Sequence, residues 1–74
     1  MQTHNRHTYF PNARSIAMRN RLHEAREYLK AECRAMHDEE FLDDIELGQC
    51  LRDIDDLDGA TLLHTARAFR LANT

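Results

Sequence analysis

The chain has 74 residues, of which 42% are hydrophobic and 31% are charged, with only two glycines and one proline. This length allows one domain, and this composition excludes a collagen-like chain and a low-complexity disordered chain. The formal net charge is −3 at pH 7. A chain this short buries only about 60% of its unfolded surface, so one small core must stabilise it or a partner must contribute.

The charges are divided unevenly between the two halves of the chain. Residues 1–37 carry seven basic and three acidic side chains, a net charge of +4, whereas residues 38–74 carry three basic and ten acidic side chains, a net charge of −7. All ten of those acids lie between Asp38 and Asp58. We therefore expect a dipolar molecule, whose two halves attract each other or the complementary halves of a second copy.

Residues 1–11 are polar and end in Tyr9, Phe10 and Pro11. Because a proline disfavours the helical conformation in the residue before it, no helix should run through Phe10. The sequence predicts a flexible N-terminal tail over residues 1–11 and a single helical domain over residues 12–74.

A long helix is predicted from Ala13 to about His37, with Asn12 as its N-cap. Apolar side chains recur every three or four residues and form one stripe, at Met18, Leu22, Ala25, Leu29, Cys33 and Met36. Basic side chains follow one flank of this stripe, at Arg19, Arg26, Lys30 and Arg34. At 1.5 Å per residue, such a helix would be about 37 Å long.

The middle segment is also predicted to be helical, with Asp38 as its candidate N-cap. Its apolar side chains fall on two opposite faces, with Phe41, Leu42 and Ile45 on one, and Leu47, Cys50, Leu51, Ile54 and Leu57 on the other. Glycine weakens a helix, so we expect a kink or short break near Gly48. The alternative is one helix that is buried on two sides, which requires a partner.

Asp58 and Gly59 separate the middle segment from a third helix. Either Gly59 ends the helix before it, or Asp58 caps the helix after it. The third helix carries a compact apolar stripe and should fray near Asn73; the stripe consists of Leu62, Leu63, Ala66 and Phe69.

These elements predict an all-α fold, a small helical hairpin or three-helix bundle with a long first helix. No window of the sequence alternates in the manner of a β-strand. The apolar surface on both sides of the middle segment exceeds what one small core needs. We therefore expect a homodimer or higher oligomer, with Phe41, Leu42 and Ile45 at its interface.

The sequence favours a cytoplasmic protein without membrane contact. No apolar run approaches the roughly 20 residues of a membrane span, and the first seven residues lack the apolar segment of a secretory signal. Two cysteines are too few for a miniprotein held together by disulfides. Cys33 and Cys50 are therefore expected to be reduced thiols that pack as small apolar residues.

No arrangement of residues in the sequence is typical of catalysis, of a metal site or of a cofactor site. Cys33 and His37 share one helix face, but Cys33 lies in the apolar stripe and the chain has no Cys-x-x-Cys pair. There is no glycine-rich phosphate loop and no pairing of a nucleophile with a base. We expect no enzymatic activity, no metal and no cofactor.

The favoured hypothesis is a small non-enzymatic interaction protein, an inhibitor or adaptor of a type that phages and mobile elements encode. Ten carboxylates within twenty-one residues can dock on a protein target with a basic surface. The candidate binding residues are the acids Asp43, Asp44, Glu46, Asp53, Asp55 and Asp56.

Two alternatives remain at this stage. The first is an oligomer that sequesters a nucleotide or another phosphate-bearing small molecule through Tyr9, Arg14, Arg19 and Arg26. The second is weak nucleic-acid binding by the basic stripe of the first helix. The net acidic balance and the glutamates on that helix disfavour nucleic acid as a partner.

Overall fold

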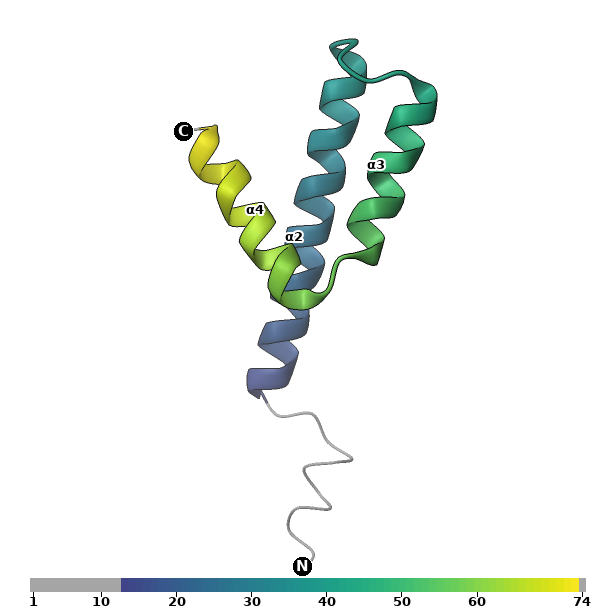
Figure 1. Cartoon of the computed structure of the whole chain (residues 1–74). Coiled ribbons are helices and arrows are strands. Elements are labelled where there is room, and N and C mark those ends of the chain that lie inside the picture. Colours follow the sequence, from purple (N-terminus) through teal and green to yellow (C-terminus); the bar gives the residue numbers. More distant parts are fainter. Residues whose placement is uncertain (1–12, 74) are drawn as a thin grey trace, which may run out of the picture.

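The computed structural model describes residues 13–73, which form three α-helices joined by short turns (Figure 1). The helices are α2 (Ala13–Asp38), α3 (Asp44–Asp56) and α4 (Gly59–Ala72). Residues 13–73 contain no strand, so the predicted all-α fold is confirmed. The predicted flexible tail and the predicted N-cap at Asn12 lie outside the described residues.

The three helices form an open arrangement around α2. Both α3 and α4 pack on α2, and they diverge from each other toward the C-terminal end of α4 (Figure 1). Gly59, the first residue of α4, lies beside Leu22, since a Cβ at Gly59 would be 3.3 Å from Leu22 Cδ2. The turns of α2 that precede Leu22 project beyond the other two helices (Figure 1).

The core is small and lies where the three helices meet. Its buried residues come from all three helices and are Ala25, Leu29, Cys33, Ile54, Leu62 and Ala66. The predicted apolar stripe of the first helix is therefore confirmed at its centre. It is not buried at its N-terminal end, where Met18 remains 41% exposed because neither α3 nor α4 reaches that far.

The first two helices are separated by residues 39–43, a longer break than the predicted boundary at His37 and Asp38. Glu40 has a φ of 68°, and the backbone N–H groups of Glu40 and Phe41 donate to the carbonyls of His37 and Met36. This pattern is a Schellman motif, which ends a helix with one residue in the left-handed conformation. Gly48 lies inside α3, which continues through it, so the predicted kink is wrong.

Asp43, rather than the predicted Asp38, caps α3. Its side chain accepts a hydrogen bond from Glu46 N at 2.8 Å, and the side chain of Glu46 accepts one from Asp43 N at 2.9 Å. This reciprocal capping box satisfies two backbone donors that the helix itself cannot satisfy. Asp38 is instead the last residue of α2.

At the junction of α3 and α4, Asp58 caps the helix that follows, and Gly59 does not end the helix that precedes it. Asp58 is the N-cap of α4, and its Oδ1 accepts a hydrogen bond from Thr61 N at 2.8 Å. Hydrogen bonds from Thr61 and Ala60 favour the ionised carboxylate, and they hold the pKa of Asp58 below its ordinary value. Gly59 has no positive φ, so it does not act as a left-handed helix end.

A disulfide between Cys33 and Cys50 links α2 to α3. The prediction of two reduced thiols is therefore wrong. Cys33 lies in the apolar stripe of α2 and Cys50 in that of α3. These two stripes pack against each other, which brings the two sulfurs together. Disulfides persist mainly in oxidising compartments and are rare in the cytosol, so this bond is at odds with the expected cytoplasmic location. Among residues 13–73, no helix has both the length and the apolarity needed to cross a membrane.

Candidate functional site

The acids of α3 lie on two different sides of the helix. At about 100° per residue, Asp44 and Asp55 fall on the flank nearest to the basic side chains of α2, whereas Glu46 and Asp53 fall on the opposite flank. Asp56 lies on the outer side, and Asp43 precedes the first turn. The six predicted binding residues therefore do not form one continuous acidic surface.

The flank that holds Asp44 and Asp55 is paired with α2. Asp55 Oδ1 lies 2.7 Å from Lys30 Nζ and 3.8 Å from Arg26 Nε. Asp44 Oδ1 lies 2.7 Å from His37 Nε2. The expected attraction between the two halves of the chain is confirmed at Asp55, and both carboxylates on this flank already have partners.

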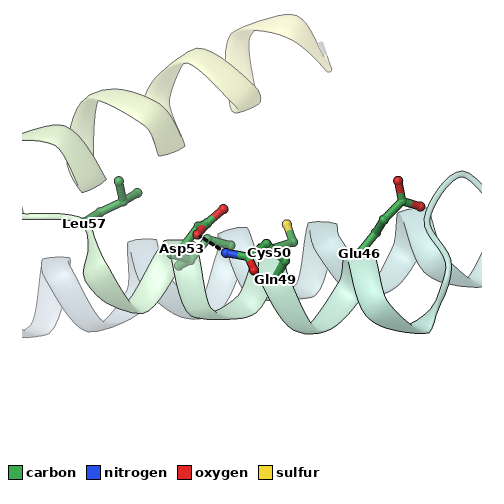
Figure 2. A pocket seen from close by; sticks show the side chains of 6 residues that line it. Glu46, Gln49, Cys50, Asp53 and Leu57 are labelled. Carbon is green, nitrogen blue, oxygen red and sulfur yellow. Dashed lines mark hydrogen bonds between the residues drawn. The ribbon is translucent and has the colours of Figure 1, made fainter.

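The opposite flank borders an open groove on the side of α3 that faces α4 (Figure 2). The groove has a volume of about 300 Å³, and all of its lining residues belong to α3 and the residue that follows it: Glu46, Gln49, Cys50, Asp53, Ile54 and Leu57. The side chains of Cys50, Ile54 and Leu57 supply an apolar floor, and they follow one another at helical spacing. Cys50 and Leu57 are half-buried, so part of this floor is exposed, whereas Ile54 between them is buried.

The rim of the groove is acidic and ordered by local hydrogen bonds. Gln49 Nε2 donates to Asp53 Oδ1 at 2.8 Å, and this bond runs along the rim (Figure 2). Glu46 is held by the capping box at the other end of the groove. The site therefore combines a small apolar floor with two carboxylates on one side. We call it the α3 groove.

A second groove follows the N-terminal turns of α2. It is lined by Arg14, Ser15, Met18, Arg19 and Leu22. The structure thus brings together two of the four residues of the predicted phosphate site, Arg14 and Arg19. Arg26 is not with them, because it faces Asp55 and its Nη2 donates to Leu57 O at 3.3 Å, and Tyr9 lies outside the described residues.

The predicted oligomer interface lies at the turn between α2 and α3. Phe41 and Ile45 are 72% and 81% exposed, and Leu42 is half-buried. Phe41 and Leu42 belong to the turn itself, while Ile45 lies in the first turn of α3 and faces away from the core. A role for these residues in an interface stays a prediction.

Sequence reasoning missed the apolar floor of the α3 groove, because it assigned Cys50, Ile54 and Leu57 to the core alone. Cys50 and Leu57 are only half-buried, whereas Ile54 is buried, and no local pattern in the sequence signals this difference. Within residues 13–73, no group of three or more His, Cys, Asp or Glu side chains is placed to hold a metal ion.

Comparison with known proteins finds no matching family profile, no similar curated protein and no similar solved structure.

Proposed function

We propose that this chain is a non-enzymatic interaction protein, an inhibitor or adaptor that captures a basic amphipathic helix of a protein target in the α3 groove. The observation that carries the proposal is the pairing of an apolar floor with an acidic rim on one face of α3. Apolar side chains of the target cover the floor, and its lysines or arginines pair with Glu46 and Asp53.

A helical ligand fits the spacing of the floor. Cys50, Ile54 and Leu57 are separated by four and three residues, so they form a ridge along α3. An incoming helix that carries apolar residues at the same spacing can pack beside this ridge. The rim charges then fix the orientation of the ligand and raise its rate of association.

The proposal distinguishes two groups of acids that the sequence analysis placed together. Asp44 and Asp55 hold α3 against α2 through His37, Lys30 and Arg26. Asp53 lines the groove, and its carboxylate is the one expected to pair with a basic side chain of the target. Reversal of Asp53 should therefore weaken binding without loosening the contact between α2 and α3.

The test compares Asp53→Lys with Asp38→Lys. Both variants replace one exposed acid near the C-terminal end of a helix and change the net charge equally, but Asp38 lies outside the groove. Captured proteins would be compared by quantitative mass spectrometry, and association with any specific partner would be measured between low and high salt. We expect Asp53→Lys to lose that partner and Asp38→Lys to retain it. Equal loss of the partner by both variants would show that binding depends on net charge and not on the α3 groove.

A further inference from the structure

The projecting N-terminal turns of α2 have the features of a ligand for the α3 groove. Residues 13–21 are all exposed, and they include Ile16 and Met18, each 41% exposed. Met18 continues the same stripe that is buried further along α2 at Ala25 and Leu29. The apolar face that Met18 shares with Leu22 therefore extends past the body of its own molecule, while Ile16 lies on another side of the helix.

The charge of these turns is opposite to that of the groove. Residues 13–21 carry three arginines and no acid, at Arg14, Arg19 and Arg21. Arg14 and Arg19 border the exposed apolar surface of Met18 and Leu22, just as Glu46 and Asp53 border the floor of the α3 groove. Each surface thus has an apolar centre beside charges of one sign, and the two signs are complementary.

Two other arrangements of these surfaces are disfavoured. The projecting turns of α2 extend away from α3 of the same molecule (Figure 1), and they precede Leu22, which lies beside Gly59. Pairing of two projecting turns with each other would place three arginines against three arginines, which like-charge repulsion opposes. A second copy that offers its groove satisfies both the charge and the geometry.

We propose that the chain associates with itself, with residues 14–22 of one copy seated in the α3 groove of another. If two copies exchange these contacts reciprocally, a closed dimer forms with two equal interfaces. This inference rests on the proposed function of the α3 groove as a docking site, and it names a second copy of the chain as one of its ligands. Because the same groove takes both ligands, self-association would compete with capture of the target.

The test is a charge exchange between copies of the full chain. Arg19→Glu alters only the projecting turns, and Asp53→Lys alters only the groove. Sedimentation velocity from micromolar to millimolar protein would measure the dissociation constant for the wild type, each variant and their equimolar mixture. We expect each single variant to associate about tenfold more weakly than the wild type at about 0.15 M salt. The mixture should regain association, because the glutamate introduced in one variant then meets the lysine introduced in the other, while the native Arg19 meets the native Asp53.

Recovery in the mixture is the decisive result, because only a contact between unlike surfaces can be restored in this way. A wild-type chain that stays at 8.7 kDa throughout the concentration range would overturn the inference. So would association that survives both charge variants but is abolished by Phe41→Ser together with Ile45→Ser, since the interface would then lie at the turn. The proposed function would survive either outcome if Asp53→Lys still lost its captured target. Conversely, if the chain associates with itself but captures no target that depends on Asp53, the proposed function is wrong and the inference of self-association stands.

Discussion

Glu40 occupies a backbone position that normally favours glycine. Its φ of 68° places it in the left-handed region, where a side chain costs roughly 1 kcal/mol or more. The Schellman motif at the end of α2 requires this conformation. Glu40→Gly should therefore raise the free energy of unfolding by about 0.5–1 kcal/mol, measured by urea denaturation.

Two variants serve as controls for Glu40→Gly. Glu40→Ala removes the same charge but keeps a Cβ, so it should bring no comparable gain in stability. Glu39→Gly places the glycine one residue earlier, where no positive φ calls for it, and should destabilise the fold. Equal gains from Glu40→Ala and Glu40→Gly would show that charge, and not backbone conformation, limits stability at this turn.

Asp58 links the stability of α4 to pH. Its pKa is lowered in the folded chain, chiefly by the backbone hydrogen bond from Thr61. Ionisation of Asp58 therefore favours the folded state above the ordinary aspartate pKa of about 3.9. This contribution is lost as the pH falls through the lower pKa of the folded state.

The expected consequence is a pH-dependent difference between the wild type and Asp58→Asn. The Tm of the wild type, followed by circular dichroism, should exceed that of the variant by a constant amount between pH 7 and about pH 5. The difference should shrink in more acidic solution, because the variant has no charge to lose at this position. A difference that stays the same down to about pH 2 would show that the hydrogen bond, and not ionisation, provides the effect of the cap.

The contact between α2 and α3 depends on the disulfide as well as on packing. Cys33 and Cys50 are separated by 17 residues, and closing a loop of this length stabilises a fold by about 3 kcal/mol. That is a large share of the roughly 5–15 kcal/mol typical of small domains. Reduction should therefore lower the urea midpoint strongly, and it should weaken ligand binding because Cys50 lies on the floor of the α3 groove.

Cys33→Ala together with Cys50→Ala provides the control for reduction. This variant should resemble the reduced wild type in urea, and a reductant should not change it further. Thiol labelling of the unfolded, unreduced wild type should find no free cysteine. Two labelled cysteines per chain would contradict the disulfide and restore the sequence-based expectation of packed thiols.

The helices were predictable to different degrees. The long apolar stripe of α2 predicts a helix from Ala13 to about His37, and the structure has Ala13–Asp38. The predicted start of α3 was wrong because Asp38 and Asp43 are both good N-caps by residue type. Glu46, three residues after Asp43, is the capping-box signal that distinguishes them. The left-handed conformation of Glu40 has no comparable signal, because glutamate rarely adopts it.

The candidate site was predictable in its chemistry but not in its shape. The acid-rich composition of the middle segment is visible in the sequence, and the structure divides those acids between a flank paired with α2 and a flank that borders the groove. That division depends on which face of α3 meets Arg26 and Lys30. The disulfide shows the same principle, since Cys33 and Cys50 each lie in a predicted apolar stripe but only packing shows that the two stripes meet.

At the scale of the whole molecule, the three helices leave two complementary surfaces uncovered. The core spans only the part of α2 that α3 and α4 reach, and its buried positions on α2 begin at Ala25. The basic end of α2 and the acidic side of α3 therefore remain apart within one molecule (Figure 1). The self-association proposed above would bury part of the apolar surface that this small fold leaves exposed.

This asymmetry should appear in amide hydrogen exchange. In Asp53→Lys at low concentration, where we expect self-association to be weakened, residues 17–21 should exchange quickly because neither α3 nor α4 supports this part of α2. Residues 25–33 should exchange far more slowly, since they line the core and include the buried residues Ala25, Leu29 and Cys33. In the wild type at high concentration, residues 17–21 should become protected, and dilution should reverse this protection. Strong protection of residues 17–21 in the dilute variant would mean that the N-terminal turns of α2 are stable without a partner. The proposed docking of these turns in the groove of another copy would then lose its physical reason.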